Sequence, residues 1–193
     1  MNVAIIRYNA GNVQSVIFAL ERLGITPLLT DDPEMILKAD KIIFPGVGEA
    51  STTMAYLKDK KLDEMIKQLK QPVLGICLGM QLLCKHSEEN DTDCIGIFDN
   101  KVKLFPPDLK VPHTGWNNIT ETKSPLFNDL EKDPFVYYVH SYYAEISNNT
   151  IATTNYILPF SAALQKDNFY AVQFHPEKSA KTGETILQNF LKL

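Results

Sequence analysis

The chain has 193 residues, of which 45% are hydrophobic and 22% are charged. That is enough for one globular domain with a substantial core, so we expect a single domain over residues 1–193. Its net charge of −4 argues against a nucleic-acid-binding protein, which usually presents a basic face.

Residues 1–6 have the pattern of a strand and lack the basic region, long apolar region and cleavage site of a signal peptide. No apolar run approaches the roughly 20 residues that a membrane helix needs. The three cysteines, Cys77, Cys84 and Cys94, have no Cys-x-x-Cys spacing, and they predict neither a disulfide framework nor a zinc site. We therefore expect a cytoplasmic protein without a bound metal.

The first 44 residues alternate between short apolar runs and amphipathic segments. The predicted strands are 3–6, 26–29 and 41–44. Between the first two, apolar residues recur at helical spacing over 13–23 and Gly24 ends the helix. Before the third, Asp32 and Pro33 supply a cap and a first helical residue. This alternation predicts a parallel sheet with helices on both faces.

Two loops follow strands of this sheet, at the edge where open α/β sheets bind ligands. Asn12 lies in the first of them, and as a residue read alone it is best interpreted as a helix cap. The second is Pro-Gly-Val-Gly at 45–48. A glycine-rich loop beside a nucleophile can present a backbone amide to a developing oxyanion, although a plain turn explains the same residues.

The stretch 72–83, Pro-Val-Leu-Gly-Ile-Cys-Leu-Gly-Met-Gln-Leu-Leu, predicts a buried strand, a sharp turn at Cys77 and a helix. Gly75 and Gly79 leave the turn uncrowded, and the start of a helix favours a thiolate and an oxyanion. This pattern is the cysteine form of a nucleophile elbow. A buried structural thiol explains a lone Gly-x-Cys-x-Gly about equally well.

In the second half of the chain, strand patterns outnumber helical ones. Its predicted strands are 101–105, 117–120, 135–139, 151–156, 162–165 and 169–174. With little helix between them, they suggest an antiparallel or mixed extension of the sheet. Helical patterns are found at 51–69, 124–130 and 182–193, Cys84 is expected to be a core thiol, and the charged run 87–91 is expected to be a solvated loop.

A histidine far from Cys77 in sequence completes a possible catalytic set. In an extended segment, residues two apart point the same way, so Glu177 can reach the ring of His175 and fix its tautomer. A nucleophile, a base and an orienting carboxylate are then all present.

Gly-Ile-Cys-Leu-Gly-Met-Gln at 75–81 together with His-Pro-Glu at 175–177 resembles the class I, or triad, glutamine amidotransferases, over essentially the whole chain. The resemblance implies an α/β fold with a mixed, mostly parallel central sheet in a flavodoxin-like three-layer arrangement. It also implies glutamine hydrolysis without a cofactor, and it gives roles to individual residues. The implied catalytic residues are Cys77, His175 and Glu177, the oxyanion residues Gly46, Val47 and Leu78, and the glutamine contacts Gly48, Gln81, His140, Ser141 and Tyr142.

Three segments look most like the branch of this family that serves histidine biosynthesis: the loop 45–48, the segment 111–117 with the single tryptophan, and the aromatic run 137–143. That branch implies a cyclase partner subunit with a (β/α)₈ barrel, which receives the ammonia, and an interface at Asn12, Trp116 and Lys178. Many relatives carry an aromatic residue soon after the loop, whereas Glu49-Ala50-Ser51 stand here.

Three alternatives remain open at this point. The glutaminase of pyridoxal phosphate synthase is similarly small, but its Gly-Gly-Glu-Ser-Thr loop is absent. A stand-alone hydrolase of γ-glutamyl or peptide bonds would work at full rate without a partner. A non-catalytic binding module on this fold would be expected to have lost part of the triad.

Overall fold

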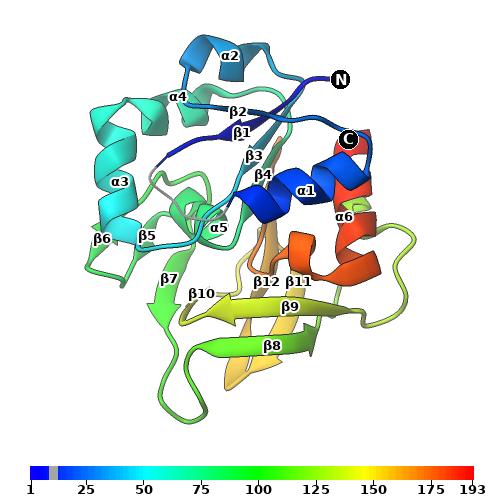
Figure 1. Cartoon of the computed structure of the whole chain (residues 1–193). Helices are drawn as coiled ribbons and strands as arrows, with labels where there is room; N and C mark the ends of the chain where they lie inside the picture. Colours follow the sequence, from blue (N-terminus) through cyan, green and yellow to red (C-terminus); the bar gives the residue numbers. More distant parts are fainter. Residues whose placement is uncertain (9–12) are drawn as a thin grey trace.

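The computed structural model describes residues 1–8 and 13–193, and its centre is a seven-stranded sheet in the order β11-β12-β13-β4-β3-β1-β2 (Figure 1). The strands of this sheet are β1 (Val3–Ile6), β2 (Leu28–Thr30), β3 (Lys41–Phe44), β4 (Val73–Ile76), β11 (Thr150–Tyr156), β12 (Leu158–Lys166) and β13 (Phe169–Val172). The pairs from β13 to β2 are parallel, while β11 and β12 join antiparallel. The predicted mixed, mostly parallel α/β sheet is confirmed.

Helices cover both faces of the sheet. They are α1 (Gln14–Arg22), α2 (Pro33–Lys38), α3 (Ala50–Asp59), α4 (Leu62–Gln68), α5 (Leu78–Leu83) and α6 (Ala180–Lys192), with short 3₁₀ helices η1 (Pro125–Phe127) and η2 (Pro176–Lys178). Successive residues of β1 serve different cores because side chains alternate along a strand. Val3 and Ile5 pack with α1 and α6, whereas Ala4 and Ile6 pack with α2 to α5. The result is the predicted three-layer arrangement.

Two smaller sheets lie outside the central one. Their strands are β5 (His86–Ser87), β6 (Thr92–Asp93), β7 (Lys101–Leu104) and β10 (Tyr142–Ala144), in the order β10-β7-β5-β6, and the antiparallel pair β8 (His113–Asn118) and β9 (Phe135–His140). The predicted extension of the sheet is therefore correct for 151–174 and wrong for 101–139. The loop predicted at 87–91 is wrong at its start, since Ser87 is in β5 and pairs with Thr92 of β6. Trp116, just before the predicted strand 117–120, lies on β8.

Two of the predicted helices differ from those in the structure. The pattern over 51–69 divides into α3 and α4 because Lys61 adopts a left-handed conformation with φ of 55°, which interrupts helical hydrogen bonding. The helix expected at 124–130 is a single 3₁₀ turn capped by Ser124. Among the described residues, no helix is both long enough and apolar enough to cross a membrane.

Candidate active site

The turn between β4 and α5 places Cys77 at the carboxyl edge of the central sheet. Cys77 has φ of 53° and ψ of −109°, a strained conformation of the kind that functional sites retain. The turn depends on Gly79, because a Cβ atom there would collide with the carbonyl oxygen of Phe44 at the end of β3. The strand, turn and helix that the sequence predicts around Cys77 are thus present, and the helix packs directly against the neighbouring strand.

His175 reaches the same edge because β13 lies beside β4. The two strands are parallel, with Val172 opposite Ile76, so the residues that follow each strand emerge together. The Nδ1 atom of His175 is 2.8 Å from Oε1 of Glu177, and both side chains are almost fully buried. The contact is the predicted one, but Glu177 makes it from the 3₁₀ turn η2 rather than from an extended segment.

Opposing effects act on the His175 imidazole. Burial lowers its pKa, while hydrogen bonds to Cys77 and Glu177 and their charges raise it; the balance raises the pKa to about 10. Within the part of the chain that the structure describes, Oε2 of Glu177 is buried without a hydrogen-bond partner. The negative charge of Glu177 is therefore compensated mainly by the imidazolium. A ring that holds its proton at neutral pH is suited to protonate a departing amine.

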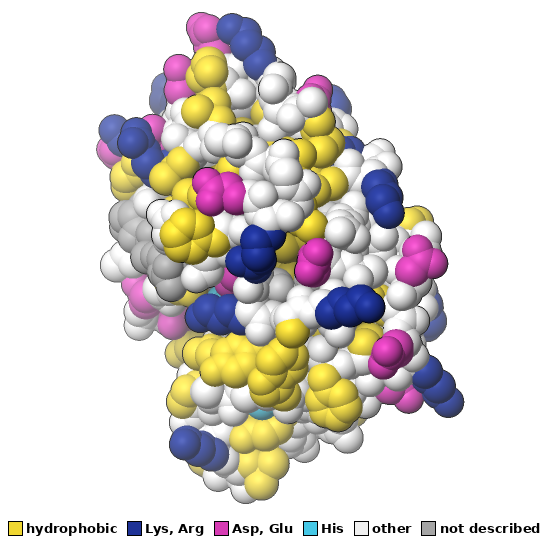
Figure 2. All heavy atoms as spheres, turned by 45° about the vertical axis from the view of Figure 1, so that its right-hand side comes forward, with side chains coloured by type: hydrophobic (Ala, Val, Ile, Leu, Met, Phe, Trp, Pro, Cys, Tyr) yellow, Lys and Arg dark blue, Asp and Glu magenta, His cyan; other side chains and the backbone are white. Residues whose placement is uncertain are grey.

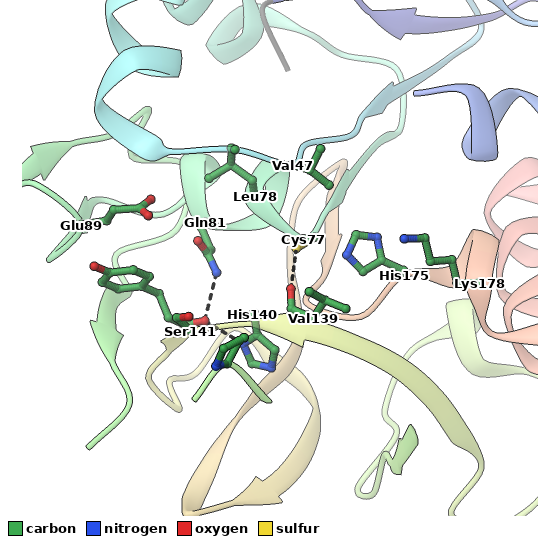
Figure 3. Close-up of a pocket in the computed structure, with 13 residues that line it drawn as sticks. Val47, Cys77, Leu78, Gln81, Glu89, Val139, His140, Ser141, His175 and Lys178 are labelled. Carbon is green, nitrogen blue, oxygen red and sulfur yellow. Dashed lines mark hydrogen bonds between the residues drawn. The ribbon is translucent and has the colours of Figure 1, made fainter. Parts of the chain in front are cut away.

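A pocket of about 330 Å³ opens in front of Cys77 (Figure 3). The predicted residues that line it are Val47, Gly48, Cys77, Leu78, Gln81, His140, Ser141, Tyr142, His175 and Lys178. Gly46 and Glu177 are not among the lining residues. Trp116 lies outside the pocket, with 52% of its surface exposed. Asn12 is outside the described residues.

In the loop 45–48, the carbonyl group of the Gly46–Val47 peptide is turned toward the start of α5. The N–H of Leu78, the predicted oxyanion donor, donates a hydrogen bond of 3.3 Å to the carbonyl oxygen of Gly46. The loop is held from behind by the buried hydroxyl of Tyr8, which donates to the carbonyl oxygen of Pro45. In this conformation the N–H of Leu78 is occupied by a hydrogen bond within the protein.

The ring of His140 points away from the pocket. Its Nδ1 atom is 2.7 Å from the carbonyl oxygen of Tyr142, and its Nε2 atom is 3.0 Å from Nδ1 of His113. Burial lowers the pKa of His140 to about 3, so the ring is neutral. Since both ring nitrogens are used inside the protein, His140 can offer a ligand its main chain, while Ser141 and Tyr142 line the pocket beside it.

Comparison with known proteins places the chain in a family. A family model described as "Glutamine amidotransferase class-I" matches residues 5–193. The chain belongs to the class I glutamine amidotransferases.

Full-length relatives include "Imidazole glycerol phosphate synthase subunit HisH" of Bacteroides fragilis (strain YCH46), 60% identical over 196 residues that span all of both chains. The protein of the same name from Vibrio cholerae is 46% identical and matches all of this chain and 98% of its own. Among solved structures, PurLQS from Thermotoga maritima has a TM-score of 0.76 at 16% identity, covering 99% of this chain and 97% of that one. This last likeness shows the fold alone.

Glu89 lines this pocket although no pattern in the sequence pointed to it. Glu89 belongs to the charged run expected to be solvated, yet the turn between β5 and β6 carries it into the pocket lining. Its Oε2 atom accepts a 2.8 Å hydrogen bond from the N–H of Ala50 at the start of α3, and its partial burial raises its pKa. Glu89 lies in the pocket only because β5 and β6 pair with each other. Such short polar strands have no periodic pattern by which a sequence could reveal them.

Proposed function

We propose that this amidotransferase is the glutaminase subunit of imidazole glycerol phosphate synthase, and that it supplies ammonia to a cyclase subunit in histidine biosynthesis. The observation that carries the proposal is the pair Cys77 and His175 in the pocket lining, with Glu177 bonded to His175, in a chain that matches subunits of that name over its full length.

The geometry around Cys77 supports the following chemistry. The sulfur attacks the carboxamide carbon of glutamine, and the oxyanion is stabilised by the N–H of Leu78 and an amide of the loop 45–48. His175 protonates the amine, which leaves as ammonia, and Glu177 holds the ring in place. His175 then takes a proton from water as the water cleaves the glutamyl thioester. The products are glutamate and ammonia, and the sulfur of Cys77 leaves as a thiolate beside the protonated His175.

The far end of the pocket suits the amino-acid end of glutamine. Glu89 and Cys77 lie on opposite sides of Gln81 (Figure 3). A carboxylate there can bind the α-ammonium group, while Ser141 and Tyr142 lie close by. The substrate would then extend from Glu89 to Cys77 with its carboxamide beside the nucleophile.

The partner surface that we propose is the outer face of β8 and β9. Trp116, Phe135 and Val139 are 52%, 58% and 38% exposed, and cross-strand pairing places Trp116 opposite Tyr137, with ring centroids 5.9 Å apart. Figure 2 shows hydrophobic side chains gathered on the lower part of the molecule, where β8 and β9 lie in Figure 1. Val139 and Lys178 also line the pocket, so a partner bound on this face would cover the pocket mouth.

Trp116→Ala tests this surface. Exposed tryptophans at interface centres are frequent hot spots that contribute at least about 2 kcal/mol, so the dissociation constant for the cyclase subunit should rise by about 30-fold or more. Isothermal titration calorimetry measures this directly. The matched control is Leu37→Ala, which removes a 53% exposed apolar side chain from α2 at the other end of the molecule. Equal affinities for both variants and the wild type would exclude the hairpin as the interface.

The proposed function predicts that the isolated chain hydrolyses glutamine very slowly. The Leu78 N–H is occupied by Gly46, and one missing oxyanion donor costs about 10²–10³ in turnover. Binding of the cyclase with its own ligand should turn the 46–47 peptide and raise kcat by about that factor, with a smaller change in KM. Steady-state glutaminase kinetics with and without the liganded partner measure it. Full activity of the lone chain would instead indicate a stand-alone hydrolase, and activation confined to KM would mean that the loop is no gate.

A further inference from the structure

A buried chain of two carboxamides connects the sulfur of Cys77 to a backbone carbonyl of the pocket wall. Nε2 of Gln81 lies 3.0 Å from the carbonyl oxygen of Tyr142 and 3.0 Å from Oε1 of Gln173. Nε2 of Gln173 lies 3.7 Å from Sγ of Cys77. Both glutamines are buried, and Gln173 is fully inaccessible to solvent.

The direction of every hydrogen bond in this chain is fixed by its first member. The carbonyl oxygen of Tyr142 has no hydrogen to donate, so the atom of Gln81 that faces it must be the amide nitrogen. The second hydrogen of that nitrogen points to Gln173, which must therefore present its oxygen. The remaining end of the Gln173 carboxamide is an NH₂ group, and it faces the sulfur.

A donor at this position matters because water has little access to the sulfur. Cys77 is only 7% exposed, and the carbonyl oxygen of Val139, which lies 3.8 Å from Sγ, can accept a hydrogen bond from the thiol but has none to donate. A hydrogen bond donated to a charged group stabilises the charged form. Two ionisable side chains also interact with the sulfur: His175 from the segment after β13, and Tyr8 from the segment after β1.

We infer that Gln173 is a catalytic residue, whose amide N–H stabilises the Cys77 thiolate, and that Gln81 is a positioning residue that holds the Gln173 amide in the donating orientation. The inference deepens the proposed function and rests on Cys77 being its nucleophile. It also limits the part that Gln81 can play in binding: both of its amide hydrogens are used within the protein, so only its carbonyl oxygen is left for glutamine.

The test is the pH dependence of Cys77 alkylation in the full-length chain, which needs neither glutamine nor a partner. Iodoacetamide labelling is followed by peptide mass spectrometry, which separates Cys77 from Cys84 and Cys94. Gln173→Met keeps the side-chain length and removes the donor. We expect the midpoint of the alkylation profile to move up by about one pH unit, a tenfold loss of thiolate at a given pH below it, which corresponds to one charge-assisted hydrogen bond. Gln81→Met should move the midpoint in the same direction by less, because the Gln173 amide is then free to rotate.

Asn189→Leu is the matched control, because Asn189 is also a buried carboxamide that donates to two backbone carbonyls, in α6. It should lower the melting temperature and leave the alkylation midpoint unchanged. If Gln173→Met does not fold, Gln173→Glu, nearly identical in shape, replaces it and should move the midpoint further upward, since its carboxylate repels the thiolate. A wild-type midpoint in the folded Gln173 variant would overturn the inference. If Cys77 alkylates normally while the complex turns over no glutamine, it is the proposed function that fails.

Discussion

Replacing Cys77 with alanine is expected to abolish glutamine hydrolysis while the complex continues its synthesis when ammonium salt is supplied. Removal of the nucleophile from a catalytic triad lowers turnover by as much as about 10⁶. Under the proposed function the cyclase subunit takes only ammonia from this chain, and the salt provides it. The two activities, glutamate release and ammonia-dependent product formation, are measured on the same preparation.

Cys94→Ala is the control for this experiment, because Cys94 lies outside the pocket and Cys84 is part of the core. Both remaining thiols are poor nucleophiles: burial raises the pKa of Cys94 to about 12 and that of Cys84 well above its usual value. Glutaminase activity near the wild-type level in Cys77→Ala would therefore contradict the assignment of the nucleophile.

Glu177→Gln should lower glutamine turnover by about 10⁴. Glu177 accepts a hydrogen bond from Nδ1 of His175, and an amide in its place can present NH₂ to that nitrogen and favour the wrong tautomer, the origin of an effect of this size in serine proteases. Solvent offers little compensation, because the Glu177 side chain is only 4% exposed. The variant also removes one of the contacts that hold the His175 pKa near 10, so that pKa should fall.

Glutamine binding should change little in Glu177→Gln, since Glu177 does not line the pocket. Calorimetric titration of glutamine into Cys77→Ala, with and without the second change, measures binding without turnover. Glu184→Gln, an exposed residue of α6, controls for the loss of one negative charge. Turnover at the control level in Glu177→Gln would remove this carboxylate from the mechanism.

The parts of the fold that were predictable from sequence are those that depend on local patterns. The buried runs of β1, β3 and β4 and the capped start of α2 follow from residues within a few positions of each other. The pairing of β5 with β7 and of β8 with β9 is set by contacts between distant segments, which no window of sequence contains. The sequence shows that these segments are strands, but it does not show which sheet each strand joins.

The residues of the candidate site likewise divide into those that local motifs predict and those that only the fold reveals. Cys77 and His175 stand in recognisable motifs, and their roles came from those motifs and the family resemblance. Glu89 looks like any surface acid, and Gln173 looks like an ordinary strand residue; each acquires a role only through what the fold places beside it. The direction of the Gln173 amide depends on a carbonyl 31 positions earlier, that of Tyr142.

The position of β13 between β12 and β4 has a consequence for biosynthesis of the protein. A nascent chain that has not yet emerged beyond about residue 165 contains Cys77 but leaves β4 as an unpaired edge, since its neighbour on that side is β13. Such an edge is prone to pair with other chains, and long-range strand pairing is slow to form. Most of the chain must therefore emerge from the ribosome before His175 can lie beside Cys77. A fragment that ends before β13 cannot hydrolyse glutamine. The nascent chain is most prone to aggregate, and most in need of a chaperone, in the interval before β13 pairs with β4.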